Sequence, residues 1–194
     1  RLRHLSGFAK YAVPTGLGQL EVSLQGYRGT WRPTEQIPES IIGTPTCPDR
    51  YCSPDPTARG ETSRFIGNVR LSGDSYRLNA YAQYYDWSMY SNPTYANIDP
   101  AAPDYGKSAQ IFQFDRRWIF GVRGEKRWQL DPALTLVVGT EDRYDDIGNV
   151  GVHHTVDRAF VSSFGAYAVR EASVAGYGEA TWKPLTGLRL TGGV

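Results

Sequence analysis

The chain has 194 residues, of which 40% are hydrophobic and 13% aromatic, and its 21 Lys and Arg nearly balance its 20 Asp and Glu. A net charge of +1 provides no field that would attract a polyanion, so we expect no nucleic-acid partner. The longest largely aliphatic run, residues 134–138, is far shorter than the roughly 20 apolar residues of a transmembrane helix, whereas a tilted transmembrane strand needs only about 9 to 11. A membrane crossing would therefore have to use strands.

Apolar and polar side chains alternate over stretches of about a dozen residues. In residues 133–145 the apolar set is Leu134, Leu136, Val138 and Tyr144, and the polar set is Thr135, Glu141, Arg143 and Asp145. A period of two indicates a strand whose two faces meet different solvents. Its recurrence along the chain predicts an all-β fold, an antiparallel transmembrane β-barrel.

Eight strands are expected in chain order. They cover residues 2–13, 19–32, 62–72, 76–90, 110–128, 133–146, 171–183 and 188–194. Short turns rich in Gly, Pro and Asp alternate with long polar loops, which we place at residues 33–60, 91–109 and 147–170. Short turns would then lie at one end of the sheet and long loops at the other, as in outer-membrane barrels, where the long loops are extracellular.

The alternation also predicts a lipid-facing surface. It comprises Phe112, Phe114, Trp118, Phe120 and Val122 of the fifth expected strand and Val174, Ala180 and Trp182 of the seventh. Arg116 interrupts the first set. Because a charge on the lipid face costs about 2–4 kcal/mol at the midplane and about 0–1 near an interface, Arg116 is expected near the rim.

Two cysteines, Cys47 and Cys52, lie in one proline-rich loop, in the segment CPDRYC. We expect them to form a local disulfide in an oxidising compartment, with free thiols as the alternative. So small a ring contributes roughly 2 kcal/mol, enough to shape a loop but not to hold a fold.

No metal or other cofactor is expected. A zinc site at the two cysteines would need two more ligands, and the histidine pair His153 and His154 falls in a different expected loop. The acidic residues of EDRYDDIG alternate between two faces, which disfavours a single calcium cage.

Four segments resemble parts of TonB-dependent outer-membrane receptors. They are YSNPTY at residues 90–95, FQFDRRWIFGVRGE at 112–125, GTEDRYDDIG at 139–148 and VREASVAGYGEATWKPLTGLRLTGGV at 169–194. Their order and spacing carry the resemblance more than any one of them does. The resemblance implies a barrel of about 22 strands whose lumen is closed by a plug domain.

On this resemblance, residues 1–194 form one partial barrel domain, incomplete at both ends and without the plug. We expect no signal peptide within this sequence, and both ends are expected to fall within strands. The family takes up scarce nutrients, commonly ferric siderophores and in other members cobalamin, haem or oligosaccharides. The implied partners are outer-membrane lipid, the small-molecule ligand, and the TonB system acting through a plug and a short box that this sequence lacks.

Ligand contacts in such receptors come from the extracellular loops, the upper lumen wall and the plug. The expected wall contacts here are Tyr85, Trp87, Arg143 and Asp145, because aromatic faces suit sugars and catecholates and a guanidinium binds a carboxylate. The alternative is that these residues only line a wet lumen and pair with one another or with the plug. Arg50 and Tyr51, between the cysteines, are candidate contacts at a loop tip.

Two other functions compete with nutrient import. A complete eight-stranded barrel with a structural or adhesive role would fit the strand count. A membrane-embedded hydrolase would need a serine and a histidine on adjacent strands near the rim, and among the expected strands only His4 provides a histidine. We therefore expect no enzymatic activity.

Overall fold

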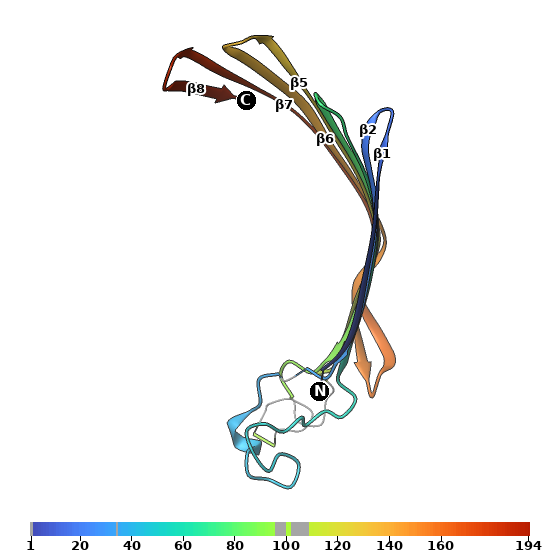
Figure 1. Ribbon diagram of the computed structural model, residues 1–194. Coiled ribbons are helices and arrows are strands. Elements are labelled where there is room, and N and C mark those ends of the chain that lie inside the picture. The colour runs from blue at the N-terminus through green and yellow to red at the C-terminus, as the bar shows by residue number, and fades with distance from the viewer. Residues whose placement is uncertain (1, 34, 96–99, 102–108) are drawn as a thin grey trace.

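A computed structural model describes residues 2–33, 35–95, 100–101 and 109–194 (Figure 1). The fold is one antiparallel sheet of eight strands that follow one another in sequence order. The strands are β1 Leu2–Thr15, β2 Gly18–Trp31, β3 Arg59–Ser72, β4 Tyr76–Ser91, β5 Ile111–Asp131, β6 Leu134–Val156, β7 Ala159–Leu185 and β8 Leu188–Gly193. A short 3₁₀ helix, η1 Glu39–Ile41, interrupts the loop between β2 and β3.

The sheet is open and strongly curved. β1 and β8 form its two edges, and the strands bend into an arc with a concave and a convex side (Figure 1). In the described part of the chain, no helix is long and apolar enough to cross a bilayer. The predicted all-β antiparallel fold is thus confirmed at the level of an eight-stranded sheet.

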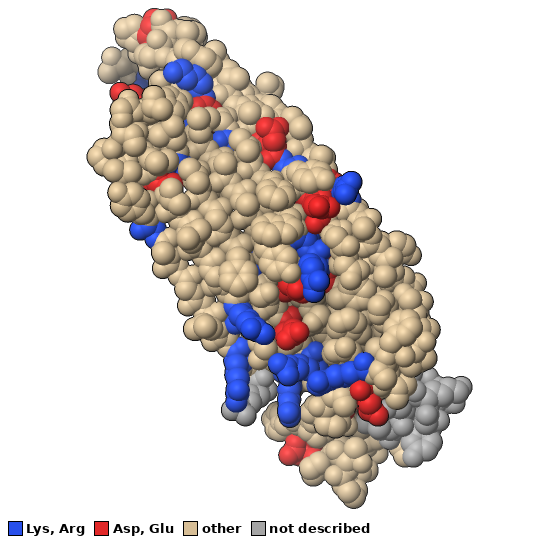
Figure 2. Space-filling model, turned by 90° about the vertical axis from the view of Figure 1, so that its right-hand side faces the viewer, with Lys and Arg blue, Asp and Glu red and all other residues tan. Residues whose placement is uncertain are grey.

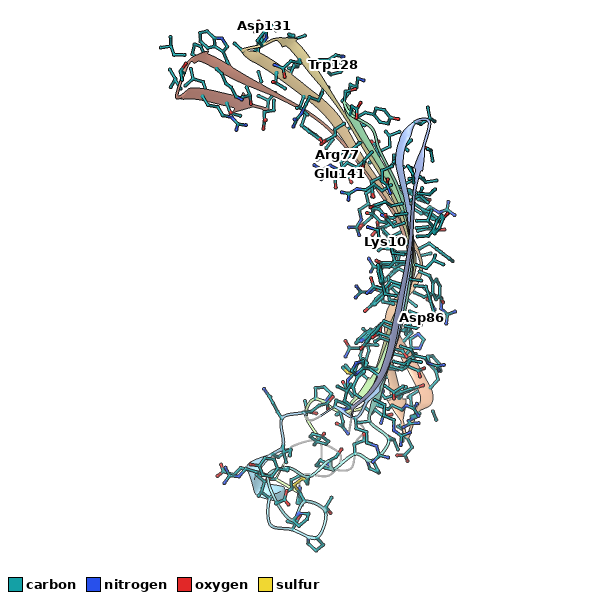
Figure 3. The ribbon with its side chains drawn as sticks, viewed as in Figure 1. Lys10, Arg77, Asp86, Trp128, Asp131 and Glu141 are labelled. Carbon is teal, nitrogen blue, oxygen red and sulfur yellow. A yellow bond between two sulfur atoms is a disulfide. The ribbon has the colours of Figure 1, made fainter. Side chains whose placement is uncertain are left out.

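The two faces of the sheet differ in polarity. Arg77 and Glu141 project from the concave side (Figure 3), and the pairing register places Asn79, Tyr85 and Trp87 on the same face as Arg77. The opposite, convex face carries large exposed apolar side chains, among them Leu5, Leu24, Phe65, Val69, Leu78, Trp118, Phe120, Val122, Val138, Val174 and Trp182. Val174 is 80% exposed.

The side chains expected to face lipid therefore share one face, with Arg116 among them. Arg116 does not stand alone there, since its Nε lies 3.0 Å from Oδ2 of Asp86 on β4. Both residues lie in the half of their strands that is nearer the long loops.

The prediction of a long loop at residues 147–170 is wrong. Residues 147–170 are strand rather than loop, because β6 continues to Val156 and β7 begins at Ala159. A tight turn at Asp157 and Arg158 joins them, with φ of 48° and 69°, the left-handed values that a two-residue hairpin turn requires. The long hairpin that results projects beyond its neighbours (Figure 1).

The other two long loops are present, at residues 32–58 and 92–110, although residues 34, 96–99 and 102–108 of them lie outside the described residues. They pack against each other at the end of the sheet opposite the short turns (Figure 1). The most deeply buried large side chains of the described chain lie there, namely Ile41, Cys47, Asn92, Tyr95 and Gln110.

A polar cluster around Asp55 ties these loops to the β6–β7 hairpin. The Asp55 carboxylate accepts hydrogen bonds from the Thr57 hydroxyl (2.6 Å) and from Nε2 of Gln110 (2.8 Å). Oε1 of Gln110 accepts in turn from the Thr155 hydroxyl and the Arg158 amide, both at 2.9 Å. We call these residues, Asp55, Thr57, Gln110, Thr155 and Arg158, the loop knot.

The pKa values of two carboxylates at the loop end are shifted in opposite directions. Burial raises the pKa of Glu35, and hydrogen bonds from the Asn92 amide and Ser91 offset this only in part. Burial also acts to raise the pKa of Asp55, but hydrogen bonds from Thr57, Gln110 and Asn92 outweigh it and leave that pKa below its usual value. Burial, with these two carboxylates nearby, raises the pKa of Tyr95 to about 12.

We predict that Asp55→Asn loosens the loops and removes an acid-dependent step in their stability. Because the pKa of Asp55 is lowered by folding, its contribution is complete above the ordinary value of 3.8 and is lost as the pH falls through the lowered value. Losing charged hydrogen bonds costs roughly 1.5–3 kcal/mol. Amide hydrogen exchange of residues 35–58, measured against pH, should show faster exchange in Asp55→Asn at neutral pH.

Asp49→Asn is the matched control, since Asp49 is exposed and its carboxylate accepts from the Tyr51 amide within its own turn. Equal loop exchange in both variants would contradict the role given to the loop knot.

Candidate ligand-binding site on the concave wall

Strand pairing brings polar and aromatic side chains into rows across the concave face. Tyr27 of β2 lies opposite Arg64 of β3, Arg64 opposite Tyr85 of β4, and Tyr85 opposite Arg117 of β5. In the next row toward the loops, Trp87 lies between Thr62 and Asp115. Side chains that are distant in sequence thus form one surface on the loop half of the wall.

A hollow of about 590 Å³ opens over β1–β4 on this surface. Its lining combines aromatic rings, one guanidinium and neutral polar groups, contributed by His4, Ser6, Gln25, Tyr27, Trp31, Thr62, Arg64, Ile66, Tyr85 and Trp87. The guanidinium carbon of Arg64 lies 5.8 Å from the centre of the Tyr85 ring, a cation–π distance. The ring of His4 stacks on Tyr27 with 6.2 Å between centroids.

Glycines allow the rings to lie flat against the wall. A Cβ on Gly60 would come within 2.2 Å of the Trp31 indole, and one on Gly29 within 2.5 Å of the Tyr27 hydroxyl. Only a residue without a side chain leaves room for such packing. The rings therefore form the floor of the hollow instead of filling it.

Next to the hollow, acidic and basic side chains form a continuous chain across β5 and β6. Arg143 holds Asp145 by two hydrogen bonds of 2.7 and 2.8 Å, a bidentate pair. Nη1 of Arg117 lies 3.8 Å from the same Asp145, and Arg117 also pairs with Asp115. Asp145 is 4% exposed, so these contacts satisfy a carboxylate that is almost fully buried.

The structure brings some of the predicted contacts together and separates others. Tyr85 and Trp87 line the same hollow. Arg143 and Asp145 lie on β6, outside its lining, and are bound to each other. Arg50 and Tyr51 are exposed between Cys47 and Cys52, which form a disulfide with a Cα–Cα distance of 5.2 Å, and neither lines the hollow.

The sequence did not single out His4, Tyr27, Trp31 or Arg64 as contacts. Alternation alone assigns Tyr27 and Arg64 to the polar faces of their strands, which is a usable signal. Register was the missing information, because a shift of one residue between strands exchanges the faces that meet.

The two histidines that were expected in a loop lie on β6. His153 is opposite Ser163 and His154 is opposite Ser162, both on β7. The ring of His153 contacts the rings of Phe114 (4.8 Å) and Phe160 (5.0 Å). Within the described residues, His153 has no hydrogen bond to Ser163 or to a carboxylate, so it does not form the linked set of groups that activates a serine.

Comparison with known proteins found no match for this chain among family models, curated proteins or solved structures. The two-faced sheet and the aromatic hollow are therefore the features of the chain that point to a function.

We predict that Gly60→Ala displaces Trp31 from the wall and destabilises the sheet by about 1–3 kcal/mol, the usual cost of overpacking. The new methyl group would overlap the indole, which would have to move. Denaturant unfolding in detergent measures the loss of stability. Gly7→Ala on β1 is the control, because a Cβ there meets no atom within 4 Å. A cost as large for Gly7→Ala as for Gly60→Ala would refute this explanation.

Proposed function

We propose that the chain is a wall segment of a TonB-dependent receptor in the outer membrane of a Gram-negative bacterium. In this proposal its convex face meets lipid and its concave face lines the lumen. The observation that carries it is the difference between the two faces. The convex face exposes many large apolar side chains, although it also carries the Arg116–Asp86 and Arg170–Asp146 pairs, and the concave face carries ion pairs and hydrogen-bonding groups. An exposed apolar surface of this extent is costly in water and favourable in a bilayer.

The curvature supports a larger barrel of about 22 strands over a small one. Eight described strands form an open arc in which β1 and β8 do not pair (Figure 1). The segments at residues 90–95, 112–125, 139–148 and 169–194 add support of a different kind, since in order and spacing they resemble parts of TonB-dependent receptors. A plug domain and the TonB system would be the coupling partners.

The proposed cargo is a ferric siderophore, recognised in part by the hollow on the concave wall. Flat aromatic faces at Tyr27, Tyr85 and Trp87 suit catecholate rings, and Arg64 suits the negative charge of such complexes. The hollow lies in the half of the wall nearer the long loops, where a ligand arriving from outside would first meet the lumen.

We predict that Trp87→Ala weakens uptake. Truncation of a central aromatic contact typically costs more than about 1.4 kcal/mol, which corresponds to at least tenfold in affinity. The assay measures iron-limited growth of cells that depend on the full-length protein containing this sequence. Catecholate, hydroxamate and carboxylate siderophores are supplied separately as their ferric complexes. The concentration that gives half-maximal growth on the active complex should rise about tenfold.

Trp182→Ala is the control, because Trp182 is a similarly large ring on the convex face of β7 and is 50% exposed. Unchanged uptake in Trp87→Ala would remove the hollow from the proposal. Growth that never depends on the protein with any siderophore would remove iron uptake itself.

The mass of the native protein separates a receptor from a small barrel. An antibody raised against the CPDRYC loop should detect, in outer-membrane fractions, a band several times heavier than the 21.6 kDa of this chain. A band near 21.6 kDa would instead indicate a small barrel with a structural or adhesive role.

A further inference from the structure

Four arginines converge on a second hollow, at the loop end of the sheet. Arg3 of β1, Arg32 after β2, Arg59 of β3 and Arg158 of the β6–β7 turn line a space of about 320 Å³, together with Thr30 and Trp31. The four come from segments that are far apart in the sequence. Figure 2 shows the convex side, where Lys and Arg side chains gather toward the lower, loop end while much of the rest is uncharged.

Among the residues that the structure describes, no carboxylate lines this second hollow. In the described part of the chain, none of the four arginines is in an ion pair with an acidic residue, and neither is Glu61, which lies opposite Thr30 on the same face. Arg158 is held in place, since its Nε donates to the Thr57 carbonyl (2.7 Å) and its guanidinium lies 5.5 Å from the centre of the Tyr90 ring. Like charges brought together without an acidic partner favour the binding of an anion.

The position of the arginines indicates which kind of molecule would bring the anionic group to them. Register places Arg3 and Arg59 on the convex face, and Leu5, two residues from Arg3, is 77% exposed. Tyr90, opposite Arg59, begins a band of aromatic rings on that face that continues through Phe112 (4.4 Å) and Phe114 (5.4 Å) to His153. Arginines that border an aromatic band and an apolar surface match a phosphorylated headgroup above its acyl chains.

We propose that this arginine rim, consisting of Arg3, Arg32, Arg59 and Arg158, binds the phosphate group of an anionic membrane lipid whose acyl chains lie along the convex face. Guanidinium groups bind phosphate oxygens in pairs, and four of them match a headgroup that carries more than one negative charge. The proposal rests on the membrane location proposed above, but not on the identity of the imported ligand.

Equilibrium binding of diphosphorylated lipid A to the full-length protein containing this sequence, in non-ionic detergent, tests the proposal. The double variant Arg3→Gln/Arg59→Gln should bind the lipid roughly tenfold or more weakly, because each arginine near a lipid surface contributes to attraction. Arg70→Gln/Arg77→Gln removes the same charge from the concave face and should bind as the unaltered protein does. Should the first double variant fail to fold, each single variant is measured in its place.

The probes identify the source of the phosphate. Dephosphorylated lipid A, which keeps the acyl chains, should bind at least about tenfold more weakly, and inorganic phosphate in excess should not displace the lipid. Equal binding of both lipids, or unchanged affinity in the arginine variants, would overturn the proposal. Displacement by inorganic phosphate would assign the rim to a soluble anion and overturn it as well.

Siderophore-dependent growth distinguishes this proposal from the proposed function. If the arginine variants lose lipid binding but the unaltered protein supports no siderophore uptake, the arginine rim is established and the import function fails. If the unaltered protein supports siderophore uptake but the arginine variants bind the lipid as tightly as it does, the import function stands and the arginine rim is overturned.

Discussion

Hydrogen bonding between antiparallel strands is the constraint on which the rest of this structure depends. Once β2, β3, β4 and β5 are paired in one register, alternation sends every second side chain to the same face across the whole sheet. The apolar convex surface and the polar concave wall are consequences of that pairing. A shift of one residue between two strands would place the exposed rings of the convex face beside the ion pairs of the wall.

The concave hollow and the arginine rim use the same scaffold in different ways. The hollow is built from side chains within the strands, with its floor set by rings that lie over glycines such as Gly60. The rim is built where strands end, so its charges come from segments that only the folded chain brings together. Arg158 belongs to both the rim and the loop knot. It therefore connects the long loops to the cluster of arginines at the loop end of the sheet.

The sequence was most informative where alternation is unbroken, as in residues 20–25 of β2 and 78–85 of β4. It was least informative in β6 and β7, where the pairing register shifts between Ile147 and Val150 and again near His153 and His154. An extra residue at such a shift changes the face on which the following residues of that strand lie, and this hides the period of two. Gly148 and Asn149 at the first shift therefore resemble loop residues, and the two histidines were assigned to a loop instead of a strand.

The sequence by itself determined that the chain forms strands with two differently solvated faces, because that information is local and repeats every two residues. It also placed Tyr85 and Trp87 on the same face as each other. Tertiary structure alone decided that they meet Tyr27 and Arg64 over one hollow, and that Arg3, Arg59 and Arg158 converge. These contacts depend on register and on the path of the loops, which arise from pairing between distant segments and leave no local pattern in the sequence.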